Sequence, residues 1–187
     1  NIATEALSYI LSQSDIAKSS FLELLGNPDI NSSLTFSTQV TSDDQSRPDI
    51  VGLNINGEKQ LIIEAKFWAG LTENQPLSYF HQLPIGNDGM LLFIAPTKRF
   101  NTLWPELLER CKLQYQIGET IKASEEYWHT MVEENKGIGL LSWRYLLQFL
   151  LLGLEKVGDT NRISDVRQLL GLTERMDDLA FMPLRSE

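Results

Sequence analysis

The sequence has few cysteines, few positive charges and no long uncharged apolar run, and each of these shortages excludes a class of protein. Its one cysteine, Cys111, excludes an internal disulfide framework and is typical of a reducing compartment, so we expect a cytoplasmic location. The longest apolar stretch, residues 138–154, contains Arg144 and Gln148. Because a membrane-spanning helix needs about 20 mostly uncharged residues, this stretch predicts a buried amphipathic helix, and we expect no membrane partner.

Positive charge is scarce because 16 Lys and Arg residues stand against 25 Asp and Glu residues, which gives a net charge of −9. Nonspecific nucleic-acid binders draw their affinity from Lys and Arg side chains that neutralise phosphates. The composition therefore argues against such a binder, although an acidic chain can still carry a local basic patch or a metal-binding group of carboxylates.

Several enzyme motifs are missing from the sequence: a glycine-rich phosphate loop, a zinc-ligand spacing and a Ser-His-Asp arrangement. The two histidines, His81 and His129, stand alone without a partner motif. A length of 187 residues suits one domain with a substantial core and is short for two. The first residue is Asn1 rather than methionine, so we expect a fragment of a longer chain.

The spacing of apolar residues predicts a mixed α/β protein with three layers. Asp15 is expected to cap the second helix and Gly26 to end it. Residues 90–95, closed by Pro96, form an apolar run that predicts a strand buried on both faces. Residues 122–137 are polar and predict a mobile helix or a loop. The expected elements are a helix at 2–11, a short helix ended by Gly26, strands at 34–40, 49–56 and 60–67, a helix at 72–83, a strand at 90–95, and helices at 101–113, 142–157 and 164–176.

The dipeptide Asn56-Gly57 joins two of these strands and is the strongest short signal of a β-hairpin. Counted from a two-residue turn at this dipeptide, Asp49 and Glu64 face each other, with Cβ atoms about 5 Å apart, and a bulge would shift this pairing by one residue. Side chains at positions i and i+2 share one face of a strand. Lys66 therefore lies beside Glu64, while the intervening residue points to the other face.

Two carboxylates at this distance repel each other, and a bound Mg²⁺ relieves the repulsion. Magnesium takes oxygen ligands at about 2.0–2.1 Å, usually one or two carboxylates together with water and a substrate phosphate. The expected metal ligands are Asp49, Glu64 and the backbone carbonyl of Ala65, and Mn²⁺ is expected to substitute for Mg²⁺. Lys66 is then placed to orient or activate a water, or to hold negative charge that develops on a phosphate.

Pro48-Asp49, followed after fourteen residues by Glu64-Ala65-Lys66, resembles the motif of the PD-(D/E)xK nuclease superfamily. The order of expected elements over roughly residues 1–96 is similar to the core of that superfamily. The resemblance implies an α/β fold with a restriction-endonuclease-like three-layer core: a helix, a three-stranded antiparallel meander, a helix and a strand. It implies a single nuclease-like domain, with a catalytic core at residues 1–100 and a helical extension at 101–187.

The resemblance also implies two further site residues. Members often carry an acidic residue on the first core helix, where Glu5 stands, and a polar residue on the helix after the third strand, where Gln75 stands. Tyr79 follows four positions after Gln75, on the same helical face, and Pro76 suits the first turn of that helix. The resemblance gives Gln75 the task of holding a water or a phosphate near the metal.

Each residue also has a plainer interpretation. Asp49 can be an ordinary residue at the start of a strand, and Glu64 and Lys66 can be a solvent-facing pair on an edge strand. The strongly apolar residues before Glu64 argue against that second interpretation. Glu5 can be a solvated surface residue, and Gln75 and Tyr79 can serve packing alone.

The sequence therefore predicts a Mg²⁺-dependent deoxyribonuclease that hydrolyses phosphodiester bonds. DNA is the expected partner and RNA the alternative, and the apolar helix at 142–157 offers a face on which two copies could form a homodimer. The second hypothesis is a catalytically inactive nuclease-fold module that binds nucleic acid or a protein. The expected catalytic residues are Asp49, Glu64, Lys66, Gln75 and Glu5.

Overall fold

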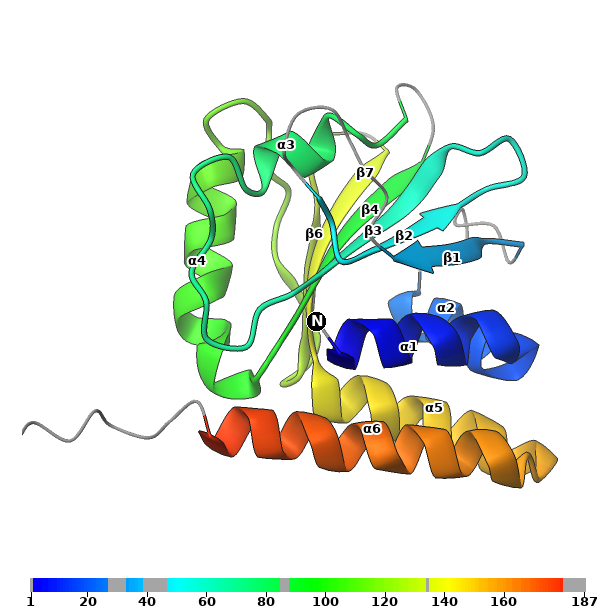
Figure 1. Cartoon of the computed structure of the whole chain (residues 1–187). Coiled ribbons are helices and arrows are strands. Elements are labelled where there is room, and N and C mark those ends of the chain that lie inside the picture. The colour runs from blue at the N-terminus through cyan, green and yellow to red at the C-terminus, as the bar shows by residue number, and fades with distance from the viewer. Residues whose placement is uncertain (1, 27–32, 39–46, 85–87, 134, 180–187) are drawn as a thin grey trace, which may run out of the picture.

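A seven-stranded mixed sheet forms the centre of the computed structural model, which describes residues 2–26, 33–38, 47–84, 88–133 and 135–179 (Figure 1). Neighbouring strands follow the order β1-β2-β3-β4-β7-β6-β5. The central strand β4 is parallel to its neighbours β3 and β7. All other pairings, β1 with β2, β2 with β3, β7 with β6 and β6 with β5, are antiparallel. The strands are β1 (Thr35–Thr38), β2 (Ile50–Leu53), β3 (Lys59–Ala65), β4 (Gly89–Ala95), β5 (Ile121–Ser124), β6 (Tyr127–Met131) and β7 (Lys136–Ser142).

Helices cover both faces of this sheet, as Figure 1 shows. One face carries four helices: α1 (Ile2–Gln13), α2 (Asp15–Leu25), α5 (Trp143–Val157) and α6 (Thr160–Leu179). The other face carries the four-residue α3 (Leu77–Phe80), the 3₁₀ turn η1 (Thr97–Arg99) and α4 (Phe100–Cys111). The predicted α/β class and the three layers are confirmed. We call the two sides the four-helix face and the α3–α4 face.

Side chains of the central strands alternate between two apolar cores, one on each side of the sheet. In β3, Leu61 and Ile63 belong to the core of the four-helix face, whereas Ile62 belongs to the core of the α3–α4 face. Because the alternation continues to the end of the strand, it directs Glu64 to the α3–α4 face. The predicted burial of β4 on both faces is confirmed, since every residue of this strand is buried.

The predicted hairpin is formed by β2 and β3, with Ile50 opposite Ile63. Continued by one residue, this register places Asp49 opposite Glu64, as the sequence predicts. The connection is longer than a two-residue turn, because Asn54 donates its N–H to the carbonyl of Glu58. A register shift after position 52 compensates for the longer turn, so the pairing near the open end of the hairpin is unchanged.

Two local predictions near the ends of helices are wrong. The cap of α2 is Ser14 rather than Asp15, because the Ser14 hydroxyl accepts the N–H of Ala17 at 3.1 Å. Gly26 ends this helix in the left-handed conformation, as predicted. The helix expected at 72–83 is only α3, because the residue before a proline is disfavoured in helical conformation and Pro76 therefore precedes the helix.

The helical extension predicted for residues 101–187 is also wrong. Residues 122–137 were expected to be a loop or helix, but they supply parts of β5, β6 and β7, which continue the sheet. The apolar stretch at 138–154 is not one helix, since it contains most of β7 followed by α5. The sequence of this stretch predicted a single helix because the buried strand β7 is apolar on both faces. Such a strand lacks the alternation of apolar and polar residues that would distinguish it from a buried helix.

The apolar side of α5 lies inside the molecule. Its buried residues pack with α2, α6 and the sheet in the core of the four-helix face. The face predicted to pair two copies therefore has an intramolecular partner. The buried residues of α5 are Trp143, Leu146, Leu147, Leu150 and Leu154.

Helices α2 and α5 approach each other closely at Gly153. A Cβ atom placed on this glycine would stand 3.1 Å from the Cβ atom of Ser20 and closer still to its hydroxyl oxygen. Glycine is therefore required here for spacing between helices and not for a special backbone conformation. Among the described residues, no helix is both long and apolar enough to span a membrane.

Candidate active site

The end of β3 places two charged side chains on the α3–α4 face. Glu64 and Lys66 are two positions apart and share this face, while Ala65 packs against the core of the opposite face. Glu64 is 7 % exposed and Lys66 is 6 % exposed, and Lys66 Nζ lies 2.9 Å from Glu64 Oε1. The backbone N–H of Lys66 donates to Ile94 of β4, which fixes the strand end. The interpretation of this pair as a solvent-facing surface feature is therefore excluded.

Asp49 lies beside this pair at the start of β2. Its Oδ2 atom accepts the backbone N–H of Ala65 at 2.9 Å, so the carboxylate occupies the open end of the hairpin. Burial raises the pKa of Asp49, and the negative charge of Glu64 raises it further, while the Ala65 N–H and the charge of Lys66 oppose the rise. The two carboxylates thus interact unfavourably, as expected for like charges at a shared site.

The Glu64 carboxylate accepts hydrogen bonds from three side chains. Lys66 and Gln75 Nε2, the latter at 3.1 Å, reach its Oε1 atom, and the Tyr79 hydroxyl reaches its Oε2 atom at 3.0 Å. Gln75 Nε2 also donates to the Tyr79 hydroxyl at 2.7 Å. Gln75 and Tyr79 are almost fully buried. These contacts hold the carboxylate in one orientation at the end of β3.

Tyr79 is the residue that the sequence analysis did not include among the catalytic candidates. Its only signal was its position four residues after Gln75, on one helical face, and the two side chains do meet. Gln75 itself lies in the turn before α3, and Tyr79 lies within α3. Burial, and then the charge of Glu64, raise the pKa of Tyr79, so its hydroxyl remains a hydrogen-bond donor at neutral pH.

Glu5 is the remaining predicted site residue. It lies on the exposed side of α1, whose buried residues face the four-helix core. The donors that hold Glu64 come from the residue after β3, the turn before α3, and α3. A place for Glu5 in the site stays a prediction.

The carboxylates at this strand end are of the chemical kind that a magnesium ion takes as ligands. The described residues contain no group of three or more His, Cys, Asp or Glu side chains that could hold a metal ion. Magnesium does not require one, since it usually takes one or two carboxylates and completes its shell with water and phosphate. The unfavourable interaction of Asp49 with Glu64 is the specific feature that a cation would relieve.

The backbone of Ala65 adds an oxygen to this set. The N–H of Lys66 points to β4 and that of Ala65 points to Asp49, so the carbonyl of Ala65 also points to the β2 side. Continuing the register places Pro48 opposite Ala65. Proline has no N–H to donate to that carbonyl. The predicted ligands Asp49, Glu64 and Ala65 therefore lie at the same end of the hairpin.

Comparison of the chain with protein-family models, curated proteins and solved structures gave no match, so its functional assignment depends on the geometry described above.

Proposed function

We propose that this chain is a Mg²⁺-dependent nuclease that hydrolyses phosphodiester bonds of DNA, in a restriction-endonuclease-like fold. The observation that carries the proposal is the buried pair of Glu64 and Lys66 beside half-buried Asp49. This is the same residue set, in the same spatial relation, that the sequence pattern predicts for such a centre.

The stability of the fold does not explain why Glu64, Lys66 and Asp49 carry charges at this buried position. A buried ion pair loses the hydration of both ions, and replacing it with apolar side chains is often neutral or stabilising. Asp49 adds a second carboxylate whose charge is disfavoured by its surroundings. Clusters in which burial and a like charge raise the pKa of a carboxylate are concentrated at functional sites. A role in chemistry therefore explains this arrangement better than a role in stability.

Each residue has a distinct task in the proposed reaction. Mg²⁺, when held by Asp49, Glu64 and the Ala65 carbonyl, would acidify a water and polarise the phosphate. The Lys66 ammonium stabilises negative charge that develops on the phosphate oxygens. Gln75 and Tyr79 keep the Glu64 carboxylate fixed. The water oxygen forms a bond to phosphorus, the bond from phosphorus to the leaving oxygen breaks, and that oxygen gains a proton.

Cleavage of linear and plasmid DNA, with RNA in parallel, tests the proposal. Wild-type protein is incubated with Mg²⁺, with Mn²⁺ and with EDTA, beside Lys66→Ala and Lys59→Ala. Lys59 is the matched control because it lies on the same strand and bonds Gln82 at 2.6 Å, away from the carboxylates. We expect cleavage that requires metal, a loss of at least about 100-fold in Lys66→Ala, as for removal of one group that stabilises transition-state charge, and no loss in Lys59→Ala.

The removal of Lys66 leaves the Glu64 charge buried and alone, which can destabilise the fold. The double variant Glu64→Gln with Lys66→Met removes both charges and keeps the side-chain volumes, so it tests chemistry without that cost. Circular dichroism confirms that each variant is folded. Cleavage that persists in the folded double variant would overturn the proposal.

A binding module without catalysis is the second candidate. Two observations favour it: the protein already supplies three donors to Glu64, and the net charge of the chain is −9. Calorimetric titration with Mg²⁺ separates the candidates. A nuclease should bind Mg²⁺ in a manner lost in Asp49→Asn, whereas a module without a metal centre should show no such difference.

A further inference from the structure

The segment that links Lys66 to α3, residues 67–75, lies along α4 (Figure 1) and is held there by two arginines. Arg99 Nη1 donates to the carbonyls of Phe67, at 3.3 Å, and Ala69, at 2.7 Å. Arg110 Nη1 donates to the carbonyls of Thr72 and Gln75, the latter at 2.9 Å. Arg110 thus contacts the backbone of a residue whose side chain reaches Glu64.

Thr72 and Gln75 form a closed turn that Arg110 holds at both ends. The N–H of Gln75 donates to the Thr72 carbonyl at 3.1 Å, and the N–H of Thr72 donates to Gln75 Oε1 at 3.2 Å. Arg110 bonds both carbonyls of this turn with a single nitrogen. Glu106, one turn earlier on α4, accepts Nη2 of Arg110 at 2.7 Å and orients the guanidinium.

This turn also fixes which end of the Gln75 amide faces Glu64. The Thr72 N–H can only donate, so the oxygen of the Gln75 amide must face it and the nitrogen must face away. That nitrogen then donates to Glu64 Oε1 and to the Tyr79 hydroxyl. An unbroken series of contacts therefore runs from Arg110 on α4, through the turn, to the carboxylate at the end of β3.

We infer that Arg110 is a positioning residue for Glu64, acting through the Thr72–Gln75 turn. Its effect on cleavage rests on the proposed nuclease function, but its effect on the contact between Gln75 and Glu64 does not. Gln75 bonds the proposed metal-binding carboxylate directly, and mutation of such a partner typically changes metal affinity or activity by about 10–100-fold. Arg110 acts one step further away, so its effect should lie at the lower end of that range. Sequence patterns did not single out Arg110, because it lies on a predicted helix 46 positions beyond Glu64.

The inference is distinguishable from a purely structural role for Arg110. Its side chain is 27 % exposed, and a partly exposed ion pair such as the one it makes with Glu106 contributes little to stability. Arg144 is a matched control, because it is an arginine on α5 whose guanidinium bonds Glu126 at 2.6 Å, away from the Thr72–Gln75 turn. Arg110→Met and Arg144→Met each remove one arginine that is paired with a glutamate.

Nuclear magnetic resonance of ¹⁵N-labelled protein gives a readout that is independent of cleavage. The side-chain amide signals of Gln75 are assigned by their loss in Gln75→Glu. In wild type we expect these amide protons to exchange slowly with water, because the group is buried and bonded on both sides. In Arg110→Met we expect exchange to be measurably faster, because the turn that holds the amide loses two hydrogen bonds and opens more often, and in Arg144→Met we expect no change.

Cleavage kinetics complete the experiment. We expect Arg110→Met to lower kcat by about tenfold, the lower end of the range for partners that bond a metal ligand directly, with KM little changed, because the proposed effect of Arg110 passes through Gln75 to Glu64. Arg110→Lys keeps the charge but lacks the planar guanidinium, so it should give an intermediate loss. It also serves as the test variant if Arg110→Met does not fold.

The two proposals fail separately. Unchanged Gln75 signals and exchange in folded Arg110→Met, or in Arg110→Lys if that is the folded variant, would overturn the positioning inference even if wild type cuts DNA. Faster exchange in Arg110→Met together with no cleavage by wild type would support the positioning inference and overturn the nuclease. Faster exchange together with lower kcat would support both.

Discussion

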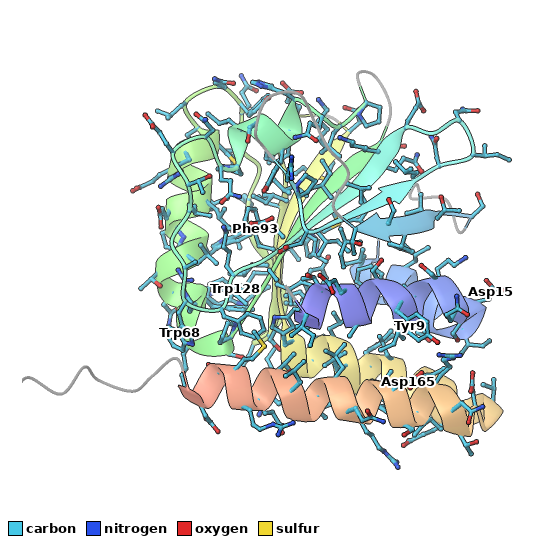
Figure 2. The ribbon with its side chains drawn as sticks, in the orientation of Figure 1. Tyr9, Asp15, Trp68, Phe93, Trp128 and Asp165 are labelled. Atoms are coloured by element: carbon cyan, nitrogen blue, oxygen red, sulfur yellow. The ribbon has the colours of Figure 1, made fainter. Side chains whose placement is uncertain are left out.

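The two faces of the sheet differ in how they are covered and in what they carry. The four-helix face buries side chains from α1, α2, α5 and α6 in the larger apolar core. The α3–α4 face has one long helix, one four-residue helix and a linking segment held through its backbone carbonyls. Figure 2 illustrates the contrast within one view, with Phe93 and Trp128 packed in the core of the α3–α4 face and Tyr9 and Asp165 lining the groove between α1 and α6.

This difference separates stability from chemistry. The buried charges Glu64 and Lys66 project to the thinly covered face, where short elements and a turn supply donors at defined positions. The dense opposite face supplies the apolar burial that offsets the cost of those charges. A substitution in the core of the four-helix face should therefore change the free energy of unfolding and leave the contacts of Glu64 unchanged.

The largest expected effect tests the four-helix face. Leu150→Ala removes a side chain of α5 that is fully buried in this core. We expect unfolding to become easier by about 2–5 kcal/mol, as for other buried Leu→Ala changes, measured by urea denaturation. The Gln75 amide signals should be unaffected below the denaturation midpoint. A change in those signals would show that the four-helix core and the site on the α3–α4 face are not independent.

Gly153→Ala should have the next largest effect. The new Cβ atom would overlap Ser20, so α2 and α5 must separate or Ser20 must change rotamer. We expect a loss of about 1–3 kcal/mol in the free energy of unfolding, as for other overpacked cores. Ser20→Ala in the same chain removes the nearest atom and should restore part of the loss. Additive effects of the two changes would contradict the proposed clash.

Asp49→Asn tests the other face and should raise stability at neutral pH. Because the pKa of Asp49 is raised in the folded protein, the protonated form is favoured on folding. The protonated Asp49 carboxyl therefore stabilises the fold fully below its ordinary pKa of 3.8. That stabilisation is lost as the pH rises through the higher pKa that Asp49 has in the folded protein. The uncharged amide avoids that loss, so Tm should increase at pH 7, by about 2–4 °C for each kcal/mol released in a protein of this size.

The increase in Tm that Asp49→Asn causes should become smaller as the pH falls toward 3.8. Asp15→Asn is the control, and we expect it to lower Tm rather than raise it. The Asp15 carboxylate in the first turn of α2 interacts favourably with the helix dipole, and the amide loses that interaction. Thermal scans between pH 3 and pH 8 check both changes. A destabilised Asp49→Asn protein at pH 7 would show that the carboxylate is favoured in the fold, contrary to the expected strain.

Glu5→Ala should have the smallest effect. Surface substitutions usually change the free energy of unfolding by less than about 0.5 kcal/mol, and Glu5 is exposed on α1. Cleavage should fall much less than in Lys66→Ala. A comparable loss of cleavage in folded Glu5→Ala would bring α1 into the site and would weaken the separation of the two faces.

The sequence predicts the centre of the site better than the sheet that surrounds it. Asn56-Gly57 and the alternation of β3 are local signals, so the register of Asp49 against Glu64 follows from them. The compensating shift in the hairpin leaves that register intact. Gln75 and Tyr79 do meet, although the helix that was expected to carry both begins only after Pro76.

The margin formed by β5, β6 and β7 was not predictable from such local signals. β5 is mostly exposed and contains Lys122, and a single turn separates it from β6, so its polar residues resemble a loop. β7 runs directly into α5 at Ser142, without a break in the apolar pattern. Of these strands, β7 pairs with β4, with Gly89 opposite Lys136, and β6 and β5 then extend the sheet from β7. The pairing of β7 with β4 depends on tertiary structure.

The local origin of the β2–β3 hairpin has a consequence for folding kinetics. Hairpins form in about 1–10 μs, whereas pairings between distant segments, such as β4 with β7, are slow. Asp49 and Glu64 can therefore approach while both are still in water, where like charges at this distance repel only weakly. We expect their repulsion to grow when Gln75 and Tyr79 cover Glu64, after the hairpin has formed. We expect Asp49→Asn to slow unfolding and to leave the folding rate nearly unchanged, as for any interaction absent from the transition state.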